Sequence, residues 1–240
     1  MKHLLPIAVL SLATACSALA SPPVVTLGYL PPGVSIVKTI VESARPAPLE
    51  DEGMPEDHTT ARQVVLRVKG QPVREYDFGM SNYVAVGELH SADAKKYPSI
   101  TGAAKKLKAL LGKRPLTPPS ELSVYPPLDA ALEIVTHFSY IDGEWGSGYG
   151  AVVIFAQDTP RVTNADIQYY FQGLTKDGRF YVTATFALTN PKLPANYEVA
   201  DQNATTEDDI KLLQKLPGDS FTPSLDEIRK LIASITIAEK

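Results

Sequence analysis

The stretch YYFQGLTKDGRFYVTATFALTNP spans residues 169–191 and decides the fold. Its second half alternates between apolar side chains and polar or aromatic ones, which is the period of a β-strand with one face on the core. The apolar set is Phe180, Val182, Ala184, Phe186 and Leu188, and the facing set is Arg179, Tyr181, Thr183 and Thr185. Asp177-Gly178 predicts a tight turn in which the glycine takes a positive φ. The stretch therefore predicts an antiparallel hairpin, whose second face meets water, a helix or a partner.

A second hairpin is predicted just before it, in LEIVTHFSYIDGEWGSGYGAVVIFAQ at residues 132–157. Two apolar strands are joined by a loop that contains Trp145 and the glycines Gly146, Gly148 and Gly150. A dinucleotide-binding loop would lead into a helix, whereas this loop leads into a strand. The glycines are therefore predicted to serve a tight hairpin or bulge.

Further strands and three helices are predicted around these hairpins. Strands are indicated by the alternation Val64, Leu66, Val68, by the residues after the turn at Gly70, and by NYVAVGEL at 82–89. One helix is capped by Ser99 or Thr101 and closed by Gly112, one starts at Thr206 with Asp209 three residues on, and one opens at Pro223. The last carries an apolar stripe of Leu225, Ile228, Leu231, Ile232 and Ile235. These elements predict one α+β domain at residues 61–240, an antiparallel sheet of about six to eight strands covered by helices.

Residues 21–60 are rich in proline and acidic side chains and are predicted to form an N-terminal segment and tether that precedes the domain. The part after Ala44 is expected to be the flexible tether. The run VSIVKTIV at residues 34–41 fits a short helix or a strand that packs on the domain.

The first 20 residues have the cationic start, apolar run and small-residue end of an export signal. A lipoprotein signal of residues 1–15, followed by a lipid on Cys16, is the alternative, because Ala13-Thr14-Ala15-Cys16 is similar to a lipobox. Cys16 is the only cysteine, so no internal disulfide can form. The sequence therefore predicts an extracytoplasmic protein that is secreted, periplasmic or anchored as a lipoprotein.

The charge balance argues against two classes of partner. The chain has 23 Lys and Arg against 27 Asp and Glu, a formal net charge of −4. Nucleic acid and anionic membrane surfaces are therefore not expected as partners, and the apolar run of the signal is too short to span a bilayer. Contact with a membrane is expected only through a lipid on Cys16. The basic cluster Lys105, Lys106, Lys108, Lys113 and Arg114 is predicted to be a solvated helix face.

No catalytic residue, metal site or cofactor is predicted. His58, His90 and His137 lack the spacing of metal ligands on a helix. His137 alternates with Phe138 on a strand and is expected on the exposed face. The loop at Asp142 and Glu144 lacks the spacing of a full calcium motif.

The candidate binding residues are aromatic. Trp145, Tyr149, Tyr170 and Tyr181 lie in successive strand segments and could stack on a sugar or hold a protein partner. The alternative is that such side chains only suit half-buried strands.

The order of segments resembles a group of uncharacterised secreted bacterial proteins and lipoproteins. The resemblance lies in the Gly-containing loop before an apolar strand, in FQGLTKDGRFYV at residues 171–182, in NPKLP, and in the SFTP helix that closes the domain. This chain departs from the group at Ala187–Pro191, where an earlier proline is expected. The resemblance implies export and a single α+β domain, and no activity comes with it.

The leading hypothesis is a non-catalytic binding or structural module of the cell envelope that contacts protein or glycan. The alternatives are a small secreted hydrolase and a carrier of a soluble ligand.

Overall fold

The computed structural model describes residues 21–44, 61–70, 82–89, 96–120, 122–126, 130–157, 161–200 and 205–239. The large sheet contains β2 Ser35–Glu42, β3 Gln63–Lys69, β4 Tyr83–Glu88, β5 Ala131–Asp142, β6 Gly146–Ala156, β7 Gln168–Thr175 and β8 Phe180–Ala187. A ribbon is formed by β1 Val24–Leu27 and β9 Ile235–Ala238, and the helices are α1 Pro98–Lys113, α2 Thr206–Lys215 and α3 Leu225–Ala233, with short 3₁₀ turns at Tyr197–Val199 and Gly218–Ser220. None of the helices in these ranges is long and apolar enough to cross a membrane.

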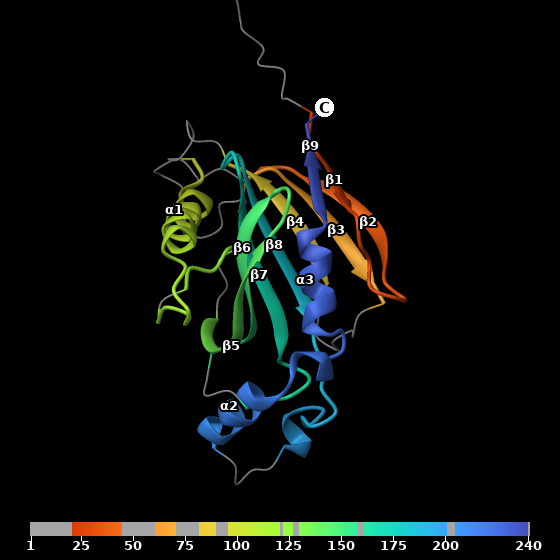
Figure 1. The fold of residues 1–240 in the computed structure, drawn as a ribbon, viewed down its shortest axis with the longest axis vertical. Helices are drawn as coiled ribbons and strands as arrows, with labels where there is room; N and C mark the ends of the chain where they lie inside the picture. The colour runs from red at the N-terminus through yellow and green to blue at the C-terminus, as the bar shows by residue number, and fades with distance from the viewer. Residues whose placement is uncertain are drawn as a thin grey trace, which may run out of the picture.

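The seven strands are antiparallel and lie in the order β2-β3-β4-β8-β7-β6-β5 (Figure 1). Consecutive strands pair as hairpins from β5 to β8, and β8 then pairs with β4. The predicted α+β domain with an antiparallel sheet of six to eight strands is confirmed.

Helices cover the two faces of the sheet separately. Apolar side chains of α3 and of the β1-β9 ribbon pack on one face, against residues such as Phe171 and Val182. On the other face, Ile100 and Leu107 of α1 pack against Tyr181. We call these the α3 face and the α1 face.

The central hairpin has the predicted turn and the predicted apolar face. Gly178 has a φ of +70°, and the Asp177 carboxylate accepts a hydrogen bond from the Arg179 backbone N–H at 3.0 Å. The second face of β8 is covered within the fold, partly by helix α1, so every residue of this strand is buried. Alternation marks one apolar face, but it does not reveal that α1 and the chain that follows it also cover the other face.

The three glycines near Trp145 lie within β6 rather than in a loop. Gly146 closes a tight hairpin turn as predicted, because it exchanges backbone hydrogen bonds of 2.9 and 3.2 Å with Gly143, whereas Gly148 and Gly150 lie further along the strand. Only Gly143, Glu144 and Trp145 separate β5 from β6. A Cβ built on Gly148 would lie 2.3 Å from Cζ of Phe171, and one on Gly150 would lie 2.2 Å from the Tyr169 hydroxyl oxygen. These glycines leave space for the aromatic rings of the neighbouring strand β7.

Two strands that precede residue 61, the predicted start of the domain, are paired with strands of the domain. β2 pairs with β3 in the large sheet, and β1 pairs with β9 at the other end of the chain. Residues 24–42 therefore belong to the folded domain, and VSIVKTIV forms a strand. Residues 45–60, predicted to be the flexible tether, and residues 71–81, where a strand was predicted, lie outside the described residues.

Helix termini differ from the predictions by a few residues. α1 has its N-cap at Tyr97 without a side-chain cap bond, so Ser99 and Thr101 lie within the helix, and its C-cap is Arg114. Thr205 with Asp208 forms a capping box on α2, and Ser224 with Glu227 forms one on α3. The apolar stripe of α3 is buried as predicted, and its last member, Ile235, begins β9.

We expect Gly148→Ala to lower the free energy of unfolding by an amount at the upper end of the range of about 1–3 kcal/mol that overpacking costs. The reason is that the new methyl group would overlap the Phe171 ring and the Gln172 carbonyl. Gly102→Ala is the matched control, since nothing lies within 4 Å of a Cβ at this exposed helical position. It should stabilise the domain by about 0.5–1 kcal/mol. Urea unfolding of both variants measures the difference, and equal effects would contradict the steric role of Gly148.

Candidate functional site

The four aromatic residues proposed as one binding surface lie on two sides of the sheet. Trp145 packs on the α3 face, where its ring makes an edge-on contact with Phe171 at 5.9 Å and its indole N–H donates to the Ile232 carbonyl at 2.9 Å. Tyr149 and Tyr181 pack on the α1 face, and Tyr170 lies in a smaller cluster beside them. All four are at most 7% exposed, so together they do not form an exposed surface.

The three tyrosines contact the chain that follows α1. We call the segment from Arg114 to Pro126 the connector; residue 121 in it lies outside the described residues. Tyr170 holds its end, since the Tyr170 hydroxyl accepts from the Tyr125 backbone N–H at 3.0 Å and donates to the Tyr125 carbonyl at 2.8 Å. The Tyr125 ring meets the Tyr181 ring edge-on at 5.3 Å.

Gln172 is the centre of this arrangement and was not among the residues predicted from the sequence. Its side chain is fully buried in β7. The amide nitrogen donates to the Ser123 carbonyl at 2.5 Å and to the Tyr149 hydroxyl at 2.6 Å, while the amide oxygen accepts from the Tyr181 hydroxyl. Tyr149 in turn donates to the Ser123 carbonyl at 3.3 Å. The sequence signal that could have identified Gln172 is a polar glutamine that follows three aromatic residues in a predicted strand.

Burial changes the acid–base behaviour of the tyrosines. It raises the pKa of Tyr149 above the usual 10, although the hydrogen bond from Gln172 acts in the opposite direction. Burial likewise raises the pKa of Tyr170 and of Tyr181 well above 10, with nearby tyrosines adding to the effect. These hydroxyls therefore stay protonated and act as hydrogen-bond donors at neutral pH.

His137 is placed differently from the prediction of an exposed strand residue. It lies at an irregularity of β5 with a φ of +53°, and its ring is partly buried. Nε2 lies 2.8 Å from the Leu216 carbonyl oxygen and Nδ1 lies 3.1 Å from the Thr136 hydroxyl. The ring also meets Phe221 edge-on at 5.4 Å. His137 therefore joins β5 to the end of α2.

The carboxylates considered in the sequence also have structural partners. Asp209 is bound by Arg161, whose Nε lies 2.6 Å from the carboxylate, and by the backbone N–H of Val162 at 3.2 Å. Asp142 pairs with Arg114. Within the described residues, no group of three or more His, Cys, Asp or Glu side chains is arranged to hold a metal ion.

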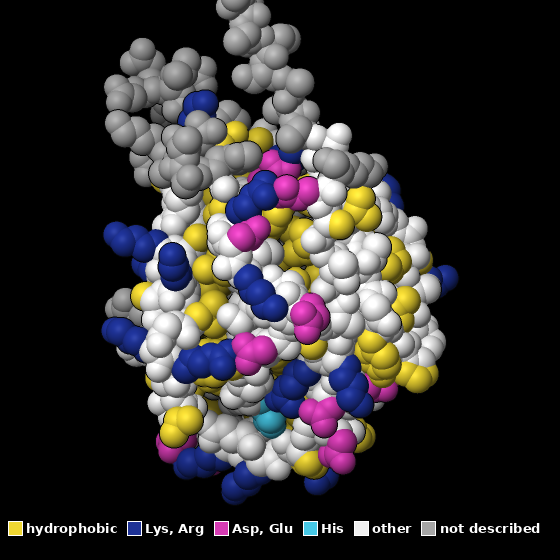
Figure 2. Space-filling model, turned by 45° about the horizontal axis from the view of Figure 1, so that its top comes forward, with side chains coloured by type: hydrophobic (Ala, Val, Ile, Leu, Met, Phe, Trp, Pro, Cys, Tyr) yellow, Lys and Arg dark blue, Asp and Glu magenta, His cyan; other side chains and the backbone are white. Residues whose placement is uncertain are grey.

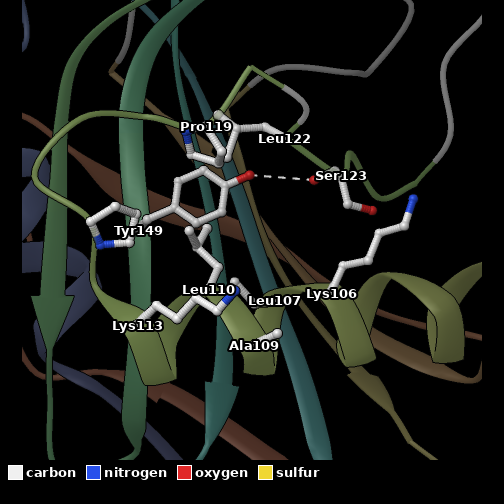
Figure 3. A pocket seen from close by; sticks show the side chains of 10 residues that line it. Lys106, Leu107, Ala109, Leu110, Lys113, Pro119, Leu122, Ser123 and Tyr149 are labelled. Carbon is white, nitrogen blue, oxygen red and sulfur yellow. Dashed lines mark hydrogen bonds between the residues drawn. The ribbon is translucent and has the colours of Figure 1, made fainter.

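A pocket of about 210 Å³ lies between α1 and the connector, with Tyr149 in its wall. Figure 3 shows the Tyr149 ring in the middle, with Leu110 of α1 below it and Pro119 and Leu122 of the connector above. Lys106 also lines the pocket from α1. Tyr149 is therefore a predicted binding residue that lines a pocket.

Several candidate residues lie outside the described residues. They are Cys16, predicted as the lipid attachment site, and the histidines His58 and His90. The export signal at residues 1–20 also lies there.

We expect Gln172→Leu to lower the free energy of unfolding by about 1–3 kcal/mol, because it leaves the buried hydroxyls of Tyr149 and Tyr181 without their shared partner. Hydrogen exchange should also become faster in residues 122–126, which this network holds. The control is Gln168→Leu, at the half-buried start of the same strand, which should change stability by no more than about 0.5 kcal/mol. Unchanged exchange in the connector would contradict the role of Gln172.

Stability should fall as the pH rises above about 10. The folded-state pKa of Tyr181 lies well above its unfolded value of 10.0. The protonated Tyr181 hydroxyl therefore contributes its full share of the folding stability at pH values below 10.0. This share is lost as the pH rises further, because the unfolded chain ionises first. Denaturant unfolding at a series of alkaline pH values measures this slope. Tyr181→Phe should make the slope shallower, and an unchanged slope in this variant would contradict the role of Tyr181.

The chain matches no protein-family model, no curated protein and no solved structure. The resemblance to secreted bacterial proteins therefore stays a prediction. Function is to be inferred from the positions of this chain's own residues.

Proposed function

We propose that this chain is a non-catalytic structural module of the cell envelope that assembles with other protein chains through the open edge of its large sheet. Strand β2 carries the proposal. It pairs with β3 on one side, and no described strand pairs with it on the other. An open edge presents backbone N–H and C=O groups to which a further strand can bind.

The side chains of β2 support this role. Val37 is 55% exposed and Val41 is 51% exposed, and Ile36 is also an exposed large apolar residue. Figure 2 shows hydrophobic side chains at the surface on the side of the molecule where β2 lies in Figure 1. Apolar β-branched residues on an open edge favour pairing with another strand.

The partner that β2 fits best is β2 of a second copy. In an antiparallel pair centred on Ile40, Lys38 of each copy opposes Glu42 of the other. Lys38, Ile40 and Glu42 lie on one face of β2, opposite Arg67, Val65 and Gln63 of β3. Two reciprocal ion pairs would therefore flank an Ile40–Ile40 contact. On the other face, Thr39 would oppose Val41.

This charge pattern also selects the register. A lysine on an edge strand ordinarily discourages pairing, and a bulge such as the one between Ile36 and Lys38 interrupts it. The regular part of β2 begins after this bulge. A shift by one residue would place Lys38 opposite Val41 of the other copy and would leave Lys38 without a charge partner. It would also turn the side chains of one copy's β2 to the opposite face of the joint sheet.

The partners of the titratable groups support a non-catalytic role. His137 contacts the Leu216 carbonyl, Asp209 binds Arg161, and Glu88 binds Arg62. Each of these groups joins two elements of the fold.

A cysteine at the centre of the proposed pair tests it. In a chain with Cys16→Ser, Ile40→Cys supplies the only cysteine. Directly opposed residues of antiparallel strands have Cα atoms about 4.5–5.5 Å apart, which suits a disulfide. We expect Ile40→Cys to form a covalent dimer under mild oxidation. Contact through one strand pair is smaller than the roughly 1,200 Å² of a stable interface, so the yield should rise with protein concentration.

Cysteines at neighbouring positions control for random collision. Thr39→Cys alone and Val41→Cys alone should give little dimer, whereas a mixture of the two should give much more, since these positions oppose each other. Equal dimer from all three single variants, or none from Ile40→Cys, would rule out the proposed pairing.

Charge reversal provides a second check. Lys38→Glu should weaken self-association, because the introduced carboxylate would oppose Glu42 of the other copy. Mixing this variant with Glu42→Lys should restore association, since each pair of opposed charges becomes complementary again. Sedimentation velocity measures both, and a mixture that associates no better than Lys38→Glu alone would contradict the register.

A further inference from the structure

The pocket between α1 and the connector has an apolar interior. Leu107 and Leu110 of α1 line one side, and Pro119 and Leu122 of the connector line the other. The Tyr149 hydroxyl is engaged with Ser123 and Gln172, so the ring rather than a free polar group of Tyr149 forms the wall. A ligand inside the pocket would therefore meet mainly hydrocarbon.

Two lysines complete the lining of the pocket. Lys106 and Lys113 both line it, and they stand two helical turns apart on the same side of α1. Figure 3 shows their side chains at opposite ends of the row of apolar residues. Of the described residues that line the pocket, none is acidic. Figure 2 shows further Lys and Arg side chains on the side where α1 lies.

These lysines differ from the neighbouring cation of the connector. Arg114 pairs with Asp142 and lies over the Tyr140 ring at 5.0 Å, so its charge is already matched. Lys106 and Lys113 form no ion pair with a described residue. Two such ammonium groups beside an apolar pocket are complementary to a ligand with an apolar body and a negative group.

We infer that this pocket binds a single-chain carboxylate amphiphile, such as a medium-chain fatty acid, with the hydrocarbon along Leu110 and Tyr149 and the carboxylate at one end of the apolar row, on the ammonium group of Lys106 or of Lys113. The volume of about 210 Å³ limits the ligand, since pockets for drug-sized molecules measure about 300–1,000 Å³. The row of apolar residues between the two lysines suits one extended acyl chain. The site is independent of β2 and goes beyond the proposed assembly role.

Octanoate is the probe for the test, and isothermal titration calorimetry on the full chain is the measurement. We expect octanoate to bind with a Kd near or below about 1 mM. Butyrate, which has the same charge and a shorter chain, should bind at least about tenfold more weakly, because less hydrocarbon is buried. Octylammonium, which has the same chain and the opposite charge, should not bind measurably.

Paired lysine variants on one helix separate a specific site from general charge attraction. Lys106→Ala with Lys113→Ala should weaken octanoate binding by about tenfold. Lys105→Ala with Lys108→Ala removes the same charge from exposed positions of α1 that do not line the pocket, and should leave Kd within about twofold. Leu110→Asn should weaken binding while both lysines remain.

Three results would overturn the inference. These are no heat of binding for octanoate at millimolar concentration, equal binding of octanoate and octylammonium, or equal losses in the two double-lysine variants. Because the Leu110 side chain is only partly buried, unfolding curves of Leu110→Asn should confirm that this variant is folded before its affinity is compared.

Discussion

The burial of both faces of the β7–β8 hairpin is the constraint on which the rest of the structure depends. A polar side chain in such a strand loses its hydration and must find a partner inside the protein. Gln172 meets this requirement through Tyr149, Tyr181 and the Ser123 carbonyl. The same bonds hold the connector against the sheet, so the polar network at the centre also positions the wall of the pocket beside α1.

The opposite face is organised by shape rather than by hydrogen bonds. Phe171 and Tyr169 need space toward β6, and Gly148 and Gly150 supply it because they lack a Cβ. Trp145 then closes the layer against α3 with its single indole hydrogen bond to Ile232. The residues with the most distinctive sequence pattern are therefore parts of the core, and the surfaces that suit ligands or partners lie at its margins, on β2 and beside α1.

Sequence patterns were reliable where the determining contacts are local. The alternation from Phe180 to Leu188 predicted the buried face of β8, and the spacing from Leu225 to Ile232 predicted the buried stripe of α3. The candidate site was less predictable. Tyr149 was found by its residue type, whereas Gln172 and the lysines Lys106 and Lys113 were not selected, because their roles depend on which segment packs over them.

Taken alone, the sequence determined the fold class, the central hairpin and the positive φ of Gly178, since these follow from side-chain period and local backbone sterics. Tertiary structure alone decided that β2 joins the sheet, that β1 pairs with β9, and that the aromatic residues fall on opposite faces. The physical reason is that strand pairing and the covering of a face join residues far apart in the chain, and no local period encodes the partner. The tyrosines became core residues because the connector folds back over them.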